Sequence, residues 1–525
     1  MSEATLVVLN ANVVTLSPEQ PQAEAIAAQD GRIIGVSSNR EIRKYMGVHT
    51  KVVDAKGKTV VPGLVDCHVH MAEFGFFLQE LNLRNAKSIR EMQQKIREYS
   101  AENVGSSWIL GGRWDHEKFD EKRYPTRWDL DAAVADKPIF LVRVCGHVAV
   151  SNSKALQLAG IAKETTIEGG SVDLDRKTGE PNGIVRENAL AFIRETIPRP
   201  ALKQREKACV AACEKAVEAG LTGVHWLVDS ADEIRILQNL NRESKLPLRV
   251  YLGIPVELLD EIVKLGFITG FGDEMVKLGF VKILSDGSLG AQTAALKEPY
   301  SDNPHTCGMM LYTQKKLNRL VLKAHVAGLQ LGVHAIGDRA VESVLKAFEI
   351  ALKRFPRKNC RHRIEHCSVL DPKLIRRMKR LDIVASVQPH FAVSDFWTAD
   401  RVGRKRFQWV YPFKTLKDEG VIVASGSDCP IENISPVLGI WAAADRKGLI
   451  AESLTAKEAL QTYTVNAAFA SFDEDKKGTI EAGKFADFVI LSDDLLSLKP
   501  SEIKTVTVEM TVVNGKVVYA KKNFR

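Results

Sequence analysis

Short apolar runs separated by turn residues fill both ends of the chain. The first part contains "TLVVLNANVVTL", "EAIAAQDGRIIGVSS" and "TKVVDAKGKTVVPG", with Asp30-Gly31 as a hairpin turn. The C-terminal part shows the same pattern around Asn514-Gly515. Because neither piece is large enough to close a hydrophobic core alone, we predict one composite β-sandwich domain built from residues 1–62 and 478–525.

Between these ends, β-type runs alternate with helical patterns, which indicates βα units around a parallel sheet. The predicted strands begin at Val65, Thr222, Leu248, Phe280, Leu331, Arg363, Val384 and Val421. Eight such strands predict an α/β fold, a (β/α)8 TIM-type barrel. Residues 63–79 would hold its first strand and 201–477 the remainder with a metal site. The stretch 80–200 would then be an insertion after the first barrel strand.

The composition is typical of a soluble globular protein, with 45% hydrophobic and 26% charged residues among 525. The net charge is +8, and the longest basic run is "RVGRKRF" at Arg401–Phe407. Such a run is typical of a solvated face rather than a nucleic-acid site. Neither a signal pattern nor a membrane-length apolar stretch is present, so we expect a cytoplasmic protein without nucleic-acid or membrane partners. The eight cysteines form no C-x-x-C pair and should be reduced.

Residues with metal-binding chemistry lie at the predicted strand ends. In "VDCHVH", His68 and His70 occupy alternate positions and so point to the same side of a strand. The other strand ends carry Lys282, His334, His366, His390 and Asp428. Any one histidine alone would be more typical of a hydrogen-bonded core residue, but their joint placement at the carboxyl ends favours a site. Imidazole and carboxylate suit one or two divalent ions: zinc first, with iron, manganese or nickel as alternatives.

Several phrases in the chain resemble the amidohydrolase superfamily, in the amidohydrolase-3 branch that includes N-substituted formamide deformylases. They are "VPGLVDCHVH", "SNSKAL", "VKILSDGSLG", "VHAIGD", "HRIEHC", "QPHF", "GSDCP" and "GTIEAGKFADFVIL". The likeness runs through nearly the whole chain. It implies that the H-x-H pair and Asp428 hold one metal, that His334 and His366 hold a second, and that a carboxylated Lys282 bridges them. An unmodified, ion-paired Lys282 with a mononuclear site is the alternative.

Four further candidates each have a structural alternative. His147, Trp226 and Asp338 are predicted to contact substrate, but they could be a capped surface histidine, a packing residue and a helix N-cap, respectively. His390 is predicted as a catalytic residue that polarises a carbonyl or holds the substrate, with a structural role as its alternative.

Together these features predict a metal-dependent hydrolase of C–N bonds other than peptide bonds, acting on a small-molecule amide or formamide. A metal-bridged hydroxide would attack the carbonyl, and Asp428 would serve as general base and acid. A deaminase or cyclic-amide hydrolase would use the same metal site, and a non-catalytic binding scaffold is an alternative from another class. A homodimer is expected.

Overall fold

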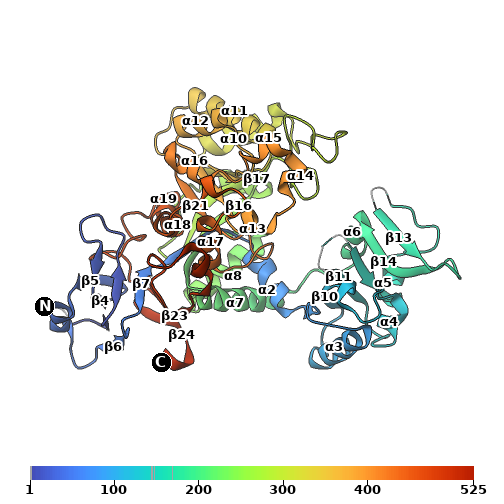
Figure 1. Cartoon of the computed structure of the whole chain (residues 1–525), viewed down its shortest axis with the longest axis horizontal. Helices are drawn as coiled ribbons and strands as arrows, with labels where there is room; N and C mark the ends of the chain where they lie inside the picture. The colour runs from blue at the N-terminus through green and yellow to red at the C-terminus, as the bar shows by residue number, and fades with distance from the viewer. Residues whose placement is uncertain (1–2, 144–145, 147, 168–169, 525) are drawn as a thin grey trace. The chain divides into compact units, whose positions relative to one another are not determined.

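The computed structural model describes residues 3–143, 146, 148–167 and 170–524 (Figure 1). The chain forms two compact units. One contains Met1–Phe74 and Cys209–Arg525, and the other contains Gly75–Ala208. The first unit holds the predicted barrel and the strands from both chain ends.

The barrel is a sheet of eight parallel strands in the order β21-β20-β19-β18-β17-β16-β15-β8. Their bounds are β8 (Leu64–Val69), β15 (Leu221–Leu227), β16 (Arg249–Pro255), β17 (Val276–Leu284), β18 (Gln330–Ala335), β19 (Arg363–His366), β20 (Val384–Val387) and β21 (Val423–Ser425). Each falls on a predicted run, so the barrel prediction is confirmed. Parallel strands are covered on both faces, and their sequences therefore read as nearly continuous apolar runs.

The first and last strands meet at a seam that lacks a regular ladder. Asp428 N donates to His68 O at 2.7 Å, and His70 N donates to Cys429 O at 2.9 Å. The approach requires glycine, because a Cβ on Gly426 would lie 2.5 Å from the backbone nitrogen of His68. The seam therefore places Asp428 beside the H-x-H pair.

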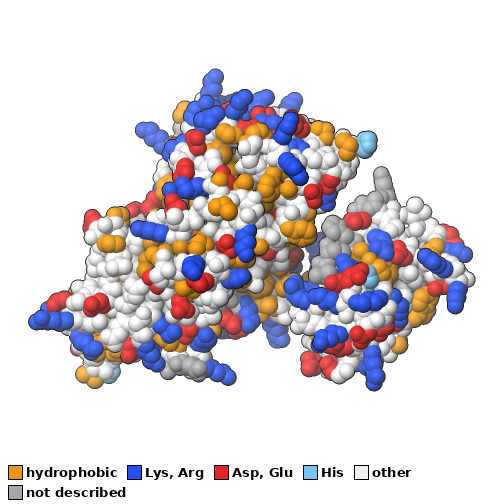
Figure 2. All heavy atoms as spheres, viewed as in Figure 1, with side chains coloured by type: hydrophobic (Ala, Val, Ile, Leu, Met, Phe, Trp, Pro, Cys, Tyr) orange, Lys and Arg blue, Asp and Glu red, His pale blue; other side chains and the backbone are white. Residues whose placement is uncertain are grey.

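Helices cover the outside of the barrel. Three of them are neighbours: α10 (Gln314–Val326), α11 (Asp338–Arg354) and α12 (Pro372–Arg380). Helix α11 buries Val341, Val344, Leu345 and Phe348, at the i, i+3, i+4, i+7 spacing of an inward-facing stripe. Its other face is polar. Figure 2 shows Lys and Arg side chains gathered at the top of the view, where Figure 1 places these helices.

The loop after β20 carries the short helices α13 (Phe391–Ser394), α14 (Thr398–Val402) and α15 (Arg404–Phe407). The prediction that the basic run here is a solvated face is wrong for Arg406. Its buried guanidinium donates to the carbonyls of Val402, Glu298 and Pro299. The bonds to Glu298 and Pro299 join this loop to the loop after β17. The three carbonyl acceptors together offset the cost of burying the charge.

Strands from the two chain ends share one sheet in the order β24-β23-β22-β7-β2-β3. Its strands are β2 (Asn12–Val14), β3 (Gln22–Ala23), β7 (Thr59–Pro62), β22 (Phe488–Leu491), β23 (Val508–Val513) and β24 (Lys516–Ala520). The second sheet, β5-β4-β1-β6, comprises β1 (Leu6–Leu9), β4 (Ala25–Gln29), β5 (Arg32–Ser37) and β6 (Lys51–Asp54). Asp30-Gly31 and Asn514-Gly515 form the predicted hairpin turns, with φ positive at both residues of each pair.

The unit Gly75–Ala208 has its own six-stranded sheet, in the order β13-β14-β12-β11-β10-β9. The strands are β9 (Leu81–Asn82), β10 (Ile109–Trp114), β11 (Ile139–Arg143), β12 (Val148–Ser151), β13 (Gly170–Leu174) and β14 (Pro181–Glu187). Buried Asn152 caps α5 (Ser153–Leu158) and also accepts the N–H of Ile139. In the described part of the chain, no helix is both long and apolar enough to cross a bilayer.

Candidate metal centre

Six predicted ligands converge at the carboxyl ends of the barrel strands. We call His68, His70, Lys282, His334, His366 and Asp428 the six-residue cluster. Asp428 Oδ1 lies 3.4 Å from His68 Nε2 and 3.3 Å from His70 Nε2. Lys282 Nζ donates to His68 Nε2 at 3.1 Å. Ring centroids lie 4.8 Å apart for His68 and His366, and 4.4 Å apart for His334 and His366.

Three of the four imidazoles are held by an acceptor at one ring nitrogen. The pairs are His68 Nδ1 to Glu365 Oε2 at 2.6 Å, His366 Nδ1 to Gln388 Oε1 at 2.7 Å, and His334 Nε2 to the Gly287 carbonyl at 3.1 Å. Each acceptor requires the proton on the nitrogen that it faces, so the lone pair lies on the other nitrogen. This division of roles is what metal-ligating histidines show.

The protonation states suit ligation. Burial, with the nearby Lys282 charge, lowers the pKa of His334 to about 4, and burial holds the pKa of His68 and His366 well below the usual value. All three are therefore neutral at neutral pH. Burial also lowers the pKa of Lys282 to about 8, against the opposing effect of two carboxylates.

Asp428 remains ionised in this setting. Burial would raise its pKa, but contacts with His68 and His70 and the charge of Lys282 outweigh that effect, and the pKa lies below the usual value. Asp428 and His366 both adopt positive φ, 58° and 75°, a backbone conformation that is uncommon outside glycine and concentrated at functional sites. The three groups His68, His70 and Asp428 have ligand atoms within 4.8 Å of one another, close enough to share an ion.

Glu365 is a site residue that the sequence analysis missed. Fully buried beneath His68, it accepts from Arg363 Nε at 2.5 Å and from Arg363 Nη2 at 3.1 Å. The guanidinium also donates to Cys67 O and Ser386 Oγ, both at 2.6 Å. The available signal was the charged pair in "RIEHC", because an arginine and a glutamate two residues apart in a buried strand share a face and need partners.

Three other predicted site residues, all of them described, do not join the cluster. Trp226 has no exposed surface and its indole N–H donates to Glu233, so it packs. Asp338 accepts backbone N–H groups of Lys297 and Arg339 at the start of α11. His390 is buried against Gly439, and within the described residues no hydrogen bond or ring contact links it to the cluster. His147 lies outside the described residues.

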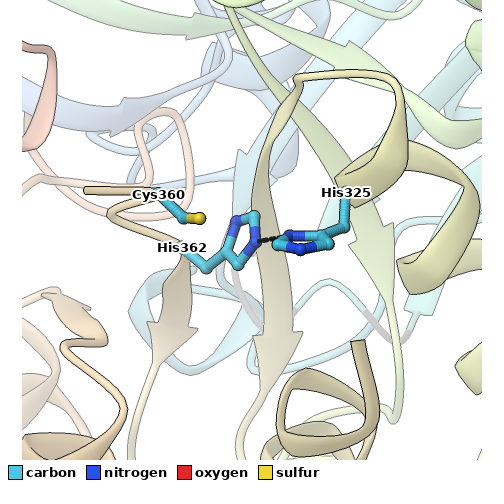
Figure 3. Close-up of side chains that lie close together, drawn as sticks. All are labelled: His325, Cys360 and His362. Carbon is cyan, nitrogen blue, oxygen red and sulfur yellow. Dashed lines mark hydrogen bonds between the residues drawn. The ribbon is translucent and has the colours of Figure 1, made fainter. Parts of the chain in front are cut away.

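A second group of buried side chains has metal-ligand atoms: His325, Cys360 and His362 (Figure 3). Leu331 N donates to His362 Nδ1 at 3.1 Å, so His362 carries its proton on Nε2 and donates it to His325 Nδ1 at 2.9 Å. His325 Nε2 then donates to Phe355 O at 2.8 Å. To bind a cation through Nε2, His362 would have to move its proton to Nδ1, where that proton would face the N–H of Leu331. All four ring nitrogens of the pair already take part in hydrogen bonds, so this arrangement favours hydrogen bonding over metal binding.

Most of the chain matches a family of known proteins. A model described as the amidohydrolase family matches residues 51–519. The chain belongs to the amidohydrolase family. The predicted amidohydrolase-3 resemblance is confirmed.

Two curated relatives of this amidohydrolase match over nearly their whole length. The Bacillus subtilis protein YtcJ, named as an amidohydrolase, is 35% identical over 97% of this chain and 98% of its own. The N-substituted formamide deformylase of Arthrobacter pascens is 26% identical, over 98% of both chains. Among solved structures, an uncharacterised metal-dependent hydrolase from Pyrococcus furiosus is 33% identical with a TM-score of 0.80, covering 94% of this chain and 100% of its own. These likenesses support hydrolase activity.

Proposed function

We propose that this amidohydrolase is a metal-dependent hydrolase of C–N bonds other than peptide bonds, with a small-molecule amide or formamide as substrate. The six-residue cluster carries the proposal, because three imidazoles are each oriented by an acceptor so that the lone pair lies on the other ring nitrogen. The whole-length likeness to an N-substituted formamide deformylase supports the formamide class.

The cluster offers ligands for two divalent ions. His68, His70 and Asp428 would hold one, and His334 with His366 a second. Lys282, once carboxylated, would bridge them; its lowered pKa supports this step, since only the neutral amine reacts with carbon dioxide. A divalent ion held there supplies Lewis-acid chemistry and lowers the pKa of water.

Asp428 is the residue to which we assign proton transfer. Its Oδ1 faces His68 and His70, and its carboxylate would take the proton of the attacking water. The same carboxyl group would then deliver that proton to the leaving nitrogen, since an unprotonated amine is a poor leaving group. The low pKa of Asp428 keeps it in the accepting form at neutral pH. His390 is left out of this acid–base assignment because it is not joined to the cluster.

The proposal is tested by a hydrolysis panel of N-formyl amines, N-acetyl amines and cyclic amides. The protein is reconstituted separately with zinc, manganese or iron, and Asp428→Asn is the control with strongly reduced turnover. We expect turnover of formamides or simple amides well above that of the control. Opening of cyclic amides alone would favour the cyclic-amide alternative. Stoichiometric metal without turnover of any class would favour a binding scaffold.

A further inference from the structure

The positive charge of the protein is concentrated in one segment. Residues 314–382, which contain α10, α11 and α12, hold 17 Lys and Arg against 6 Asp and Glu, a net charge of +11. The whole chain carries only +8, so the remainder is net −3. The excess is therefore a property of this side of the barrel rather than of the protein as a whole.

Most of these basic side chains lie at the surface. The exposed ones are Lys315, Lys316, Arg319, Lys346, Lys353, Arg354, Lys358, Lys373, Arg376, Lys379 and Arg380. Of these, only Arg380 forms an ion pair within the part of the chain that the structure describes, with Glu349. On α10 and α12 they recur at spacings of three and four, which places them on one helix face. We call this set the basic face; in Figure 2, Lys and Arg side chains gather at the top of the view, where Figure 1 places these helices.

An apolar groove adjoins the basic face. It has a volume of about 450 Å³ and is lined by Val263, Leu322, Val326, Ala327 and Phe355, together with Arg319, Lys323 and Arg354. Val326 is 53% exposed and Phe355 45% exposed. A segment docked here would therefore meet apolar and basic side chains next to one another.

We propose that the basic face and its groove bind an acidic segment of a partner protein that inserts an apolar side chain. Charge complementarity selects an anionic partner. A second copy of this chain fits poorly, because a two-fold contact would set the basic face against itself. A bilayer would require protruding apolar groups, whereas here the apolar side chains line a hollow that an inserted side chain can fill.

The test uses defined probes on the full-length protein. A fluorescent 18-residue peptide of repeating Glu-Glu-Leu is titrated by anisotropy at low salt, beside an all-Glu peptide. We expect saturable, salt-sensitive binding of the Leu-containing peptide and weaker binding of the all-Glu peptide. The triple variant Lys315→Glu, Arg319→Glu, Arg354→Glu should lose at least about tenfold in affinity, since it reverses three charges of the basic face, two of which, Arg319 and Arg354, line the groove.

Two further variants separate the contributions. Val326→Asp leaves the basic side chains in place but charges the groove, and should bring the Leu-containing peptide down to the affinity of the all-Glu peptide. The matched control Lys163→Glu, Lys177→Glu, Lys203→Glu makes the same change in net charge at exposed positions elsewhere and should bind like the parent. Circular dichroism verifies folding.

Several outcomes would overturn the proposal. They are equal peptide affinity in the charge-reversed and control triples, no saturable binding by the parent, and tighter binding to phosphatidylglycerol vesicles or a 20-nucleotide single strand than to the peptide. A dimer that Val326→Asp dissociates would instead assign the face to a second copy.

Discussion

Replacing Glu365 with Gln tests whether a buried carboxylate prepares His68 for metal. The substitution keeps the shape of the side chain but leaves one acceptor oxygen where there were two. In the parent, Oε1 accepts from Arg363 Nε and Oε2 accepts from His68 Nδ1 and Arg363 Nη2. One of these positions becomes an NH2 group that faces N–H donors, whichever way the amide turns. The buried guanidinium also loses its counter-charge.

Two magnitudes follow from these contacts. Breaking a buried ion pair costs about 3–5 kcal/mol, and we expect the lower end because Arg363 keeps its bonds to Cys67 O and Ser386 Oγ. Loss of a carboxylate behind a metal-ligating histidine typically costs 10–100-fold in metal affinity, or about 1.4–2.8 kcal/mol.

The assay measures zinc affinity in chelator-buffered solutions and unfolding by urea. Glu349→Gln is the matched control, because it makes the same chemical change in partly exposed ion pairs with Arg377 and Arg380. Each of those pairs should contribute under about 1 kcal/mol, and zinc affinity should be unchanged. If Glu365→Gln lowers stability yet binds zinc as tightly as the parent, the orienting role is refuted and Glu365 is structural.

Four further outcomes are expected. His70→Ala should lower metal content and activity together with the fold retained, as metal analysis and circular dichroism will show; unchanged metal would remove His70 from the ligand set. Lys282→Ala should lose metal and regain part of its activity with added short carboxylic acids, whereas full activity without them would refute the bridging role. Asp428→Asn should reduce turnover by roughly 10² to 10⁴ with a much smaller change in metal content, so near-parent turnover would move proton transfer elsewhere. Burial lowers the pKa of His325 and His362 below the value of about 6.5 that a histidine has in the unfolded chain. Below pH 6.5 the unfolded chain therefore binds more protons than the folded protein, so the free energy of unfolding should be full above that pH and fall below it. The fall should be up to about 1.4 kcal/mol per pH unit per histidine, until the pH reaches the pKa of the folded state. Between pH 7 and 5, the urea midpoint of unfolding should fall less steeply with decreasing pH in His362→Asn than in the parent. An equal pH dependence in the two proteins would contradict this account.

The barrel and its candidate ligands were predictable because both depend on local pattern. Strands buried on both faces read as apolar runs, and residues at their carboxyl ends must meet at one mouth. The charged pair in "RIEHC" indicated that Glu365 needs a partner, but its pairing with His68 was not predictable, since the two residues lie on strands far apart in the chain. Trp226 could not be assigned from its position because neither its burial nor its bond to Glu233 is visible in sequence.

The basic face was not predicted from the sequence. Its lysines and arginines are spread over three helices and interleaved with buried residues such as Leu317 and Leu374, so the excess charge appears only when the whole segment is summed. The run at Arg401–Phe407 was interpreted as a solvated face, although Arg406 within it is buried. Charge summed over neighbouring helices is therefore more informative here than charge along the chain.

We expect the barrel to open first at the seam between β8 and β21. Within the described residues no regular ladder joins these two strands, and the adjoining Asp428, His68 and His70 come from opposite ends of the barrel sequence. A cation shared by these three side chains would cross-link residues that are far apart in the sequence. A cross-link that closes such a long loop lowers the conformational entropy of the unfolded chain the most. Amide hydrogens along β8 and β21 should accordingly exchange faster in the chelator-treated protein than those of β17 and β18, and metal loading should slow the exchange at the seam first.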